Sequence, residues 1–508
     1  MLVPDLLSGN RSAKPAIIFE DRCISYAELD DEANRFANFY CSLGIEPGER
    51  ISFLMGNEPA VVAAYFGAFK VGLIANPINN RLTGEEIAYI IDHAGSRLVV
   101  TTPEYHDALA AALRGMATQP PVLCLGTVPA NSPLKFVDAA DLARQPVTPS
   151  AAAGIMPQHE VLLIYTSGTT GRPKGVLLTH ANVLADGRAL AQGFGLTPAH
   201  TTLCLMPLFH CNALIVSHVS SFIAGATVVL ARRFSASQHW DLVERYNVHS
   251  FSAPPTVLAI LLEREHEVRG RRLPLEYVKV GSAPLTIELA ERFEARFGKN
   301  LLVEGWGLTE ATATNTLNPL TVGQPRRIGS VGAALPGHEI RVVDDDNHML
   351  DGDMVGELVI RGPTLMKGYF RDADATAKAL AGGWLHTGDL GRIDDAGYVY
   401  LVGRKKEMII RGGENISPLE VEAVIARHPA VREVAVAGLP DRIWGEVVAA
   451  CVVPAGNVSA DDVIEFCRSH LAAFKVPQRV AFVEALPRNA IGKIMRRMLA
   501  QHFPPAVS

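Results

Sequence analysis

Over the first hundred residues, segments with the hydrophobic period of a helix alternate with segments that have the pattern of a strand. Helices are predicted at 25–44, at 59–70 and from Thr83 onward, and short apolar strands at 51–55, 73–77 and 98–102. Ser25 and Glu28, like Thr83 and Glu86, have the spacing of a capping box, in which the hydroxyl accepts the backbone N–H three residues on. Such alternation predicts a mainly parallel sheet covered by helices.

The pattern weakens between residues 115 and 158, where prolines accumulate, and we interpret this segment as an exposed connection. Helix–strand alternation resumes at Val161 and continues to about Val402. A long apolar stretch over 211–231 is interrupted by Asn, Ser and His, which a bilayer would penalise. We therefore predict a buried helix and strand there, and no integral membrane contact.

The last hundred residues have the pattern of a separate small α+β unit. Ser417-Pro418-x-Glu420 has the cap, first-turn proline and acid of a helix start. Strands at 434–437 and 447–453 and a helix after Ser459 follow. The predicted fold is α/β, with layered, mainly parallel sheets in a large N-terminal domain (1–402), a hinge (403–406) and a small mobile C-terminal α+β domain (407–508).

Composition narrows the class of protein. A chain of 508 residues is too long for one core, which agrees with two domains. The net charge of −6 does not favour a nucleic-acid partner. Seven scattered cysteines without Cys-x-x-Cys, and a start without a basic and apolar leader, favour a reducing, cytoplasmic location. The oligomeric state, monomer or homo-oligomer, stays open.

The strongest chemical signal is the segment Tyr165-Thr-Ser-Gly-Thr-Thr-Gly-Arg-Pro-Lys-Gly175, which follows a predicted strand at 161–164. Its glycines let the backbone turn N–H groups toward an anion, its hydroxyls add donors, and its lysine adds a cation. A Walker A loop, and with it a P-loop kinase, is disfavoured because the lysine precedes the last glycine. The segment is suited to a polyphosphate. Its candidate residues are Thr166, Ser167, Gly168, Thr169, Thr170, Gly171 and Lys174.

With further segments in the same order, this loop resembles the adenylate-forming superfamily of acyl-CoA synthetases, peptide adenylation domains and luciferases. Those segments are Met206-Pro-Leu-Phe-His210, Gly281-Ser-Ala-Pro284, Glu304-Gly-Trp-Gly-Leu-Thr-Glu310, Trp384-Leu-His-Thr-Gly-Asp-Leu390, Gly403-Arg-Lys-Lys-Glu407 and Pro487-Arg-Asn-Ala-Ile-Gly-Lys493. The resemblance covers about residues 15 to 500 and is closest to fatty-acyl and carnitine-type CoA ligases. It implies an enzyme that uses ATP, Mg²⁺ and coenzyme A to convert a carboxylic acid to a thioester through an acyl-adenylate.

The resemblance also implies roles for single residues. Glu310, with Thr166, binds the metal, Thr309 contacts the α-phosphate, and Asp389 and Arg404 lie at the ribose. Lys493 bridges carboxylate and phosphate, and the loss of such a contact lowers a rate by roughly 10²–10³. The groups that frame adenine and acyl are Gly281, Ser282, Ala283, Pro284, Glu304, Gly305, Trp306 and Gly307.

On the acyl side the resemblance places His210 as a gate, with Cys211 and Asn212 beside the substrate; a packing role for His210 is the alternative. For the thioester step it implies rotation about Lys406, and contacts of coenzyme A with Gly412, Gly413 and Trp444. The alternative for the basic run 404–406, a solvated face, loses weight for Arg404 in this context.

The acid itself is expected to be a short to medium aliphatic monocarboxylate. Residues 206–215 hold no acid to pair with an amino group, and 281–285 hold no arginine for a second carboxylate, although Thr316-x-Asn318-Pro319 is similar to malonyl-CoA synthetases. Two other functions stay open. A luciferase-like oxygenase would use oxygen in place of the thiol, and a non-catalytic nucleotide-binding protein would not need Lys493.

Overall fold

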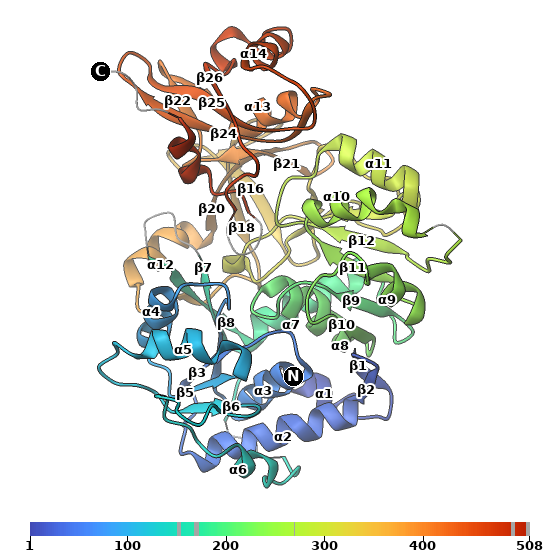
Figure 1. Cartoon of the computed structure of the whole chain (residues 1–508), viewed down its shortest axis with the longest axis vertical. Helices are drawn as coiled ribbons and strands as arrows, with labels where there is room; N and C mark the ends of the chain where they lie inside the picture. Colours follow the sequence, from blue (N-terminus) through green and yellow to red (C-terminus); the bar gives the residue numbers. More distant parts are fainter. Residues whose placement is uncertain (150–153, 167–171, 269, 489–492, 504–508) are drawn as a thin grey trace.

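The computed structural model describes residues 1–149, 154–166, 172–268, 270–488 and 493–503. Two seven-stranded sheets lie in its N-terminal part (Figure 1). The first sheet is parallel from β7 to β6 and antiparallel at its β8 and β19 edge. Its strands, in spatial order, are β19 (Gly368–Tyr369), β8 (Lys174–Thr179), β7 (Glu160–Thr166), β4 (Ile74–Pro77), β3 (Arg50–Leu54), β5 (Leu98–Thr101) and β6 (Val122–Cys124).

The second sheet is parallel except for its last strand pair. Its strands, in order, are β13 (Leu302–Glu304), β12 (Tyr277–Val280), β11 (Ser250–Ala253), β9 (Thr201–Cys204), β10 (Thr227–Leu230), β1 (Pro15–Phe19) and β2 (Arg22–Ser25). The mainly parallel sheets and the layered α/β class predicted from the hydrophobic pattern are thereby confirmed.

Helices fill the space between these two sheets and cover both outer faces. The central layer contains α1 (Asp5–Ser8), α2 (Tyr26–Ser42), α3 (Pro59–Lys70), α7 (His180–Gly193), the π-helical turn η2 (Asn212–Val219) and α8 (Ser220–Ile223). The outer face of the first sheet carries α4 (Gly84–Ala94) and α5 (His106–Leu113). The outer face of the second sheet carries α9 (His239–Arg245), α10 (Pro255–Glu263) and α11 (Ile287–Phe297).

The predicted capping boxes are present at α2 and α4, where each cap hydroxyl and the glutamate three residues on bond reciprocally. The stretch over 211–231 forms η2, α8 and β10, as expected for a buried helix and strand. None of the helices in the described ranges has the length and apolarity needed to cross a bilayer. The predicted connection over 115–158 is only partly irregular, because β6 and α6 (Ala139–Ala143) lie in it.

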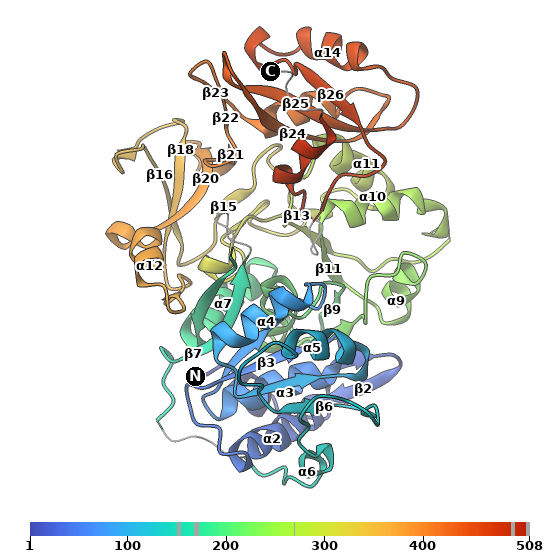
Figure 2. The same cartoon turned by 60° about the vertical axis from the view of Figure 1, so that its left-hand side comes forward.

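Beyond residue 304 the structure departs from the predicted helix–strand alternation. The third sheet is antiparallel throughout, and Figure 2 shows it as a separate layer beside α12 (Ala373–Ala379). Its strands, in order, are β14 (Thr316–Leu317), β15 (Gly332–Ala334), β21 (Tyr398–Arg404), β20 (Leu385–Ile393), β18 (Gly356–Arg361), β16 (Glu339–Val343) and β17 (Met349–Leu350). Short turns join several of these strands, so no crossover helix is required between them.

The last part of the chain folds around its own apolar core, at the top of Figure 1. It contains β22 (Ile409–Arg411), β23 (Glu414–Ile416), α13 (Pro418–Ile425), β24 (Val431–Asp441), β25 (Gly445–Pro454), α14 (Ala460–Arg468) and β26 (Arg479–Phe482). Among the described residues, the 3₁₀ turns are η1 (Pro103–Tyr105), η3 (Glu265–Val268), η4 (Thr309–Ala311), η5 (Ala381–Gly383), η6 (Ala473–Lys475) and η7 (Arg496–His502). Residues 405–407 form the turn between β21 and β22.

Candidate active site

The predicted polyphosphate loop leaves the edge of the first sheet through a hairpin. Thr166 at the end of β7 lies opposite Lys174 at the start of β8, and the two strands pair in register from there. The candidates Ser167, Gly168, Thr169, Thr170 and Gly171 lie outside the described residues. Arg172 and Lys174 line a pocket of about 300 Å³ at the base of this hairpin. The described ends of the loop therefore bring two cations to one place.

Lys174 and Glu310 are linked through Tyr369 of β19. The Lys174 ammonium lies 4.9 Å from the centre of the Tyr369 ring and 3.9 Å from Asp372. The Tyr369 hydroxyl donates to Oε1 of Glu310 at 3.0 Å, and the backbone oxygen of Glu310 accepts from Met366. The Glu310 carboxylate is thus fixed on one side by a neutral donor. Its oxygens are of the kind that Mg²⁺ prefers.

Asp389 is the most enclosed carboxylate of the predicted nucleotide site. Its Oδ2 accepts from Nε1 of Trp306 at 2.9 Å, and its Oδ1 pairs with Nε of Arg404 at 2.8 Å. Asp389 and Arg404 also face each other across β20 and β21. Trp306 is one of the residues predicted to frame adenine and acyl, and its indole N–H is in addition a direct support of the predicted ribose ligand.

Lys493 extends from the C-terminal part of the chain into the same region. Part of its side chain is open to solvent, but the crowded surroundings desolvate the ammonium and lower its pKa, as does Arg404. The carboxylates of Asp389 and Glu310 act on it in the opposite direction. Lys493 also acts on the pKa of His210, which burial lowers to about 3. One cation therefore lies within electrostatic reach of the predicted nucleotide, metal and acyl ligands.

His210, Cys211 and Asn212 lie together where the chain enters η2. The buried atoms Nε2 of His210 and Oδ1 of Asn212 have no hydrogen-bond partner among the residues that the structure describes. Burial raises the pKa of the Cys211 thiol to about 12, so it is neutral and not a nucleophile at ordinary pH. π-helical turns such as η2 are frequent at functional sites.

The glycines of the predicted frame make close backbone approaches. A Cβ on Gly281 would lie 3.1 Å from the backbone oxygen of Gly305, and one on Gly307 would lie 2.2 Å from that of Ala313. Ser282 has a positive φ of 69°, and with Ala283 and Pro284 it forms a largely open edge beside buried Gly281. The Glu304 carboxylate is engaged within the protein, since it pairs with Arg326 at 2.5 Å.

The predicted coenzyme A residues cluster on the small C-terminal unit. Gly412 and Gly413 have φ of 60° and 89°, and the N–H of Gly412 donates to the backbone oxygen of Trp444 at 2.7 Å. A Cβ on Gly412 would lie 2.9 Å from the Trp444 ring, which is 47% exposed and under the Arg411 guanidinium. Lys406, the predicted hinge, is exposed in the turn between β21 and β22.

Comparison with known proteins agrees with this geometry. A family model described as AMP-binding enzyme matches residues 8–370, and one described as AMP-binding enzyme C-terminal domain matches residues 420–493. The chain belongs to the AMP-binding enzyme family.

Relatives of this AMP-binding enzyme match it over nearly their whole length. Sulfoacetate–CoA ligase of Cupriavidus necator is 36% identical over 96% of this chain and 95% of its own, and oxalate–CoA ligase of Arabidopsis thaliana is 35% identical over 94% and 93%. The ATP-bound crystal structure of MatB from Rhodopseudomonas palustris has a TM-score of 0.89 at 30% identity and covers 99% of both chains. Membership of the adenylate-forming superfamily and the AMP-forming acid–CoA ligase class, as predicted, are confirmed.

Sequence reasoning about this AMP-binding enzyme missed three polar contributors. Tyr369 holds Glu310, and Arg326 neutralises Glu304. Lys279 lies two residues before Gly281, the first residue of the frame, and is buried against α7 near Asp186. A signal for Lys279 existed, because a lysine within the apolar strand Tyr277–Val280 breaks its hydrophobic pattern.

Proposed function

We propose that this protein activates an organic acid with ATP as the acyl-adenylate and then transfers the acyl group to coenzyme A. A single observation carries the proposal: the Lys493 ammonium of the C-terminal unit lies within electrostatic reach of Asp389 and Glu310 of the N-terminal part. A protein that only held a nucleotide would not require a cation delivered from a second unit to the meeting point of acid and phosphate.

In the first step an oxygen of the acid attacks the α-phosphorus of ATP, and the bond from that phosphorus to the oxygen of the leaving pyrophosphate breaks. Negative charge gathers on phosphate oxygens in the transition state, so fixed cations and donors stabilise it. Lys493 would neutralise charge between the carboxylate and the α-phosphate. Lys174 and the loop after Thr166 would bind the outgoing pyrophosphate, and Thr309 would donate to the α-phosphate.

Asp389 would accept the ribose hydroxyls while Trp306 and Arg404 keep its carboxylate in place. The oxygens of Glu310 and Thr166 fit Mg²⁺, a hard cation that would offset phosphate charge when bound. Neutral His210 would line the acyl group without competing with Lys493 for charge. These assignments rest on the positions of the side chains and on the family resemblance.

In the second step the thiol sulfur of coenzyme A attacks the acyl carbon, the bond from that carbon to the phosphate oxygen of AMP breaks, and the thiol proton passes to solvent. A thiol with an ordinary pKa of about 8.5 is partly ionised near neutral pH, so no dedicated base is required. We assign the domains as 1–402 and 407–508 with a hinge at 403–406, and propose rotation about Lys406 to bring Gly412, Gly413 and Trp444 to the thiol path. The cytoplasm is the proposed location.

The proposal is tested by offering the purified protein Mg²⁺, ATP and a panel of organic acids, with and without coenzyme A. We expect pyrophosphate release that depends on the acid, and AMP and thioester formation that depend on coenzyme A. A luciferase-like oxygenase would instead release AMP in a manner that depends on oxygen and not on the thiol. Nucleotide binding without pyrophosphate release from any acid would contradict the proposal.

A further inference from the structure

A buried lysine on the second sheet faces the acyl side of the site. In β12, Val278 and Val280 pack with the α10 and α11 core, whereas Tyr277 stacks on Phe194 at the end of α7, with ring centres 4.8 Å apart. Side chains alternate between the faces of a strand, so Lys279 points with Tyr277 toward α7. Lys279 is only 5% exposed.

The end of this side chain lies directly behind the predicted acyl frame. A Cβ built on Gly281 would be 3.1 Å from Nζ of Lys279, and one built on Gly305 would be 3.4 Å from its Cε. The two glycines therefore leave the space that the lysine occupies. The Lys279 ammonium therefore lies beside two of the residues assigned to frame the acyl group and adenine.

The Lys279 ammonium forms no hydrogen bond, and no ion pair within 4 Å, with the described part of the chain. The opposite charge that acts on it comes from Asp186 of α7, a fully buried residue whose two carboxylate oxygens also lack hydrogen-bond partners there. Burying a charge without a close partner is unfavourable, so an anion that reached this ammonium would remove an unfavourable interaction.

We propose that Lys279 binds an anionic group at the far end of the acyl substrate, so that the acid is a short diacid with a carboxylate or sulfonate as its second group. An ammonium only donates hydrogen bonds, and it binds charged oxygens more strongly than neutral ones. The inference rests on the proposed function, since it names the acid that is activated. It differs from the aliphatic monocarboxylate expected above, because the cation is Lys279, which lies just before the arginine-free segment 281–285.

Asp186 sets the charge of this region. Burial holds the pKa of its carboxyl well above the ordinary range, although Lys279 and the backbone N–H of Thr314 act in the opposite direction. A protonated Asp186 would leave the positive charge of Lys279 available to the ligand. The unpaired Nε2 of His210 and Oδ1 of Asn212 add polar atoms to the same side of the site.

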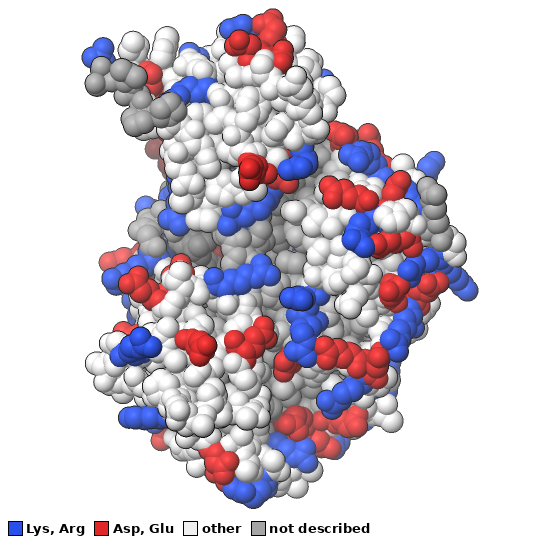
Figure 3. Space-filling model, viewed as in Figure 1, with Lys and Arg blue, Asp and Glu red and all other residues white. Residues whose placement is uncertain are grey.

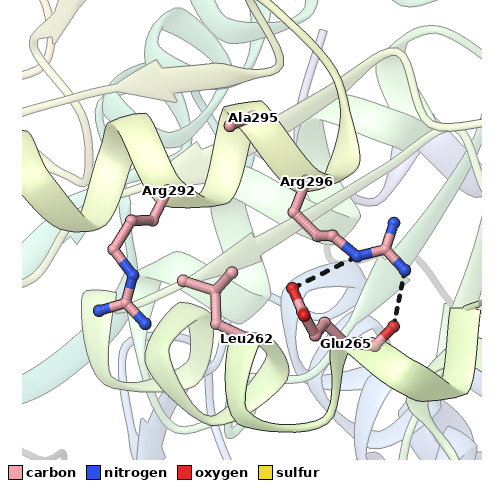
Figure 4. Close-up of a pocket in the computed structure, with 5 residues that line it drawn as sticks. All are labelled: Leu262, Glu265, Arg292, Ala295 and Arg296. Atoms are coloured by element: carbon pink, nitrogen blue, oxygen red, sulfur yellow. Dashed lines mark hydrogen bonds and ion pairs between the residues drawn. The ribbon is translucent and has the colours of Figure 1, made fainter.

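Lys279 does not line the surface pocket formed by α10 and α11. The pocket of about 410 Å³ in Figure 4 is lined by Leu262 of α10 and Arg292 of α11 and is bordered by the Arg296–Glu265 contact. These helices cover the opposite face of β12, where Val278 and Val280 point. Lys279 is therefore connected with the acyl side and not with that surface.

The test compares acids of matched length: propionate with malonate, butyrate with succinate, and propionate with sulfoacetate. The measured quantity is kcat/KM for coenzyme A-dependent AMP formation, with wild type, Lys279→Met and the exposed control Lys299→Met. We expect wild type to prefer one diacid over its monoacid. Lys279→Met should lower kcat/KM for that diacid by about 10²–10³, as for loss of one partner of a buried charge pair. Lys279→Met should lower kcat/KM for the monoacid far less than for the diacid, and Lys299→Met should change kcat/KM for either acid less than about threefold.

The malonate and succinate arms test a carboxylate as the second group, and the sulfoacetate arm tests a sulfonate. Wild-type preference for the monoacid in every pair would overturn the proposal, as would an equal loss of diacid and monoacid activity in Lys279→Met. If that variant does not fold, the wild-type preference decides alone. Turnover of monoacids only would overturn the role of Lys279 and leave acid–CoA ligation intact, whereas no coenzyme A-dependent AMP from any acid would contradict the proposed function.

Discussion

Asp389 and Glu310 on the nucleotide side have protein partners in the absence of ligand, whereas Lys279 and Asp186 on the acyl side have none within bonding distance in the described ranges. The first pair is held in place by Trp306, Arg404 and Tyr369. This difference indicates that the carboxylates proposed to bind the nucleotide and the metal are oriented by other groups of the protein, whereas the polar groups proposed to meet the acid are not.

The largest expected effect comes from removing the Lys493 ammonium, the cation proposed to act between the acid and the nucleotide. Lys493→Ala should lower acid-dependent pyrophosphate release by roughly 10²–10³, because the transition state loses a positioned charge. Thioester formation from supplied acyl-AMP should be nearly unchanged. Stopped assays of both half-reactions measure this, with Lys475→Ala, a lysine of the same unit paired with Glu420, as the control. Equal loss in both half-reactions would remove Lys493 from the adenylation step.

A smaller effect is expected from loosening the nucleotide side. Trp306→Phe keeps an aromatic ring but removes the N–H that donates to Asp389. A hydrogen bond to a charged group contributes about 1.5–3 kcal/mol, so we expect KM for ATP to rise about tenfold or more. KM for the acid should not change. Initial-rate kinetics against Trp384→Phe, a tryptophan under the Arg361 guanidinium, give the comparison; an unchanged KM for ATP would mean that Asp389 does not need this support.

The smallest expected effect is a change in stability at His239. It tests whether every buried polar group without a hydrogen-bond partner serves a ligand. His239 of α9 is buried among Trp240 and Phe251, and neither ring nitrogen has a partner among the described residues. Burial lowers its pKa from the ordinary 6.5 to about 3. The unfolded chain therefore takes up a proton below pH 6.5 that the folded chain does not take up until about pH 3, so His239 makes the fold less stable as pH falls through this window.

His239→Phe should remove about 1.4 kcal/mol per pH unit from the acid dependence of unfolding between pH 6 and 4.5. Denaturant melts at several pH values measure the slope, and His348→Phe, at a side chain 77% exposed, is the control. Activity at pH 7.5 should be preserved. A slope equal to that of wild type would show that the neutral ring is not specific to the folded state.

Local rules predicted much of the N-terminal fold. The helix Pro59–Lys70 matches its prediction, and Ser25 and Thr83 begin their helices as capping boxes because these signals involve only three or four neighbouring residues. The antiparallel third sheet was not predicted, since short strands joined by turns carry a weak period and their pairing depends on distant partners.

The candidate site shows the same limit. Loop chemistry pointed to Lys174, and the family resemblance pointed to Glu310 and Asp389. The structure brings these residues toward one region from three parts of the sequence. Tyr369 could not be found in this way, and the position of Lys279 in an apolar strand marked it as unusual without showing which buried groups it faces. Burial is a property of packing, and a single strand or turn does not encode it.

The register of β20 and β21 has a mechanical consequence. Arg404, which holds Asp389, is also the last residue of β21, and the turn at 405–407 follows it directly. A reorientation of the C-terminal unit at this turn would begin one peptide bond away from Arg404, the partner of the carboxylate proposed to accept the ribose hydroxyls. Occupancy of the nucleotide site and the orientation of the C-terminal unit can therefore influence each other through the Arg404 side chain, without a series of contacts through the rest of the protein.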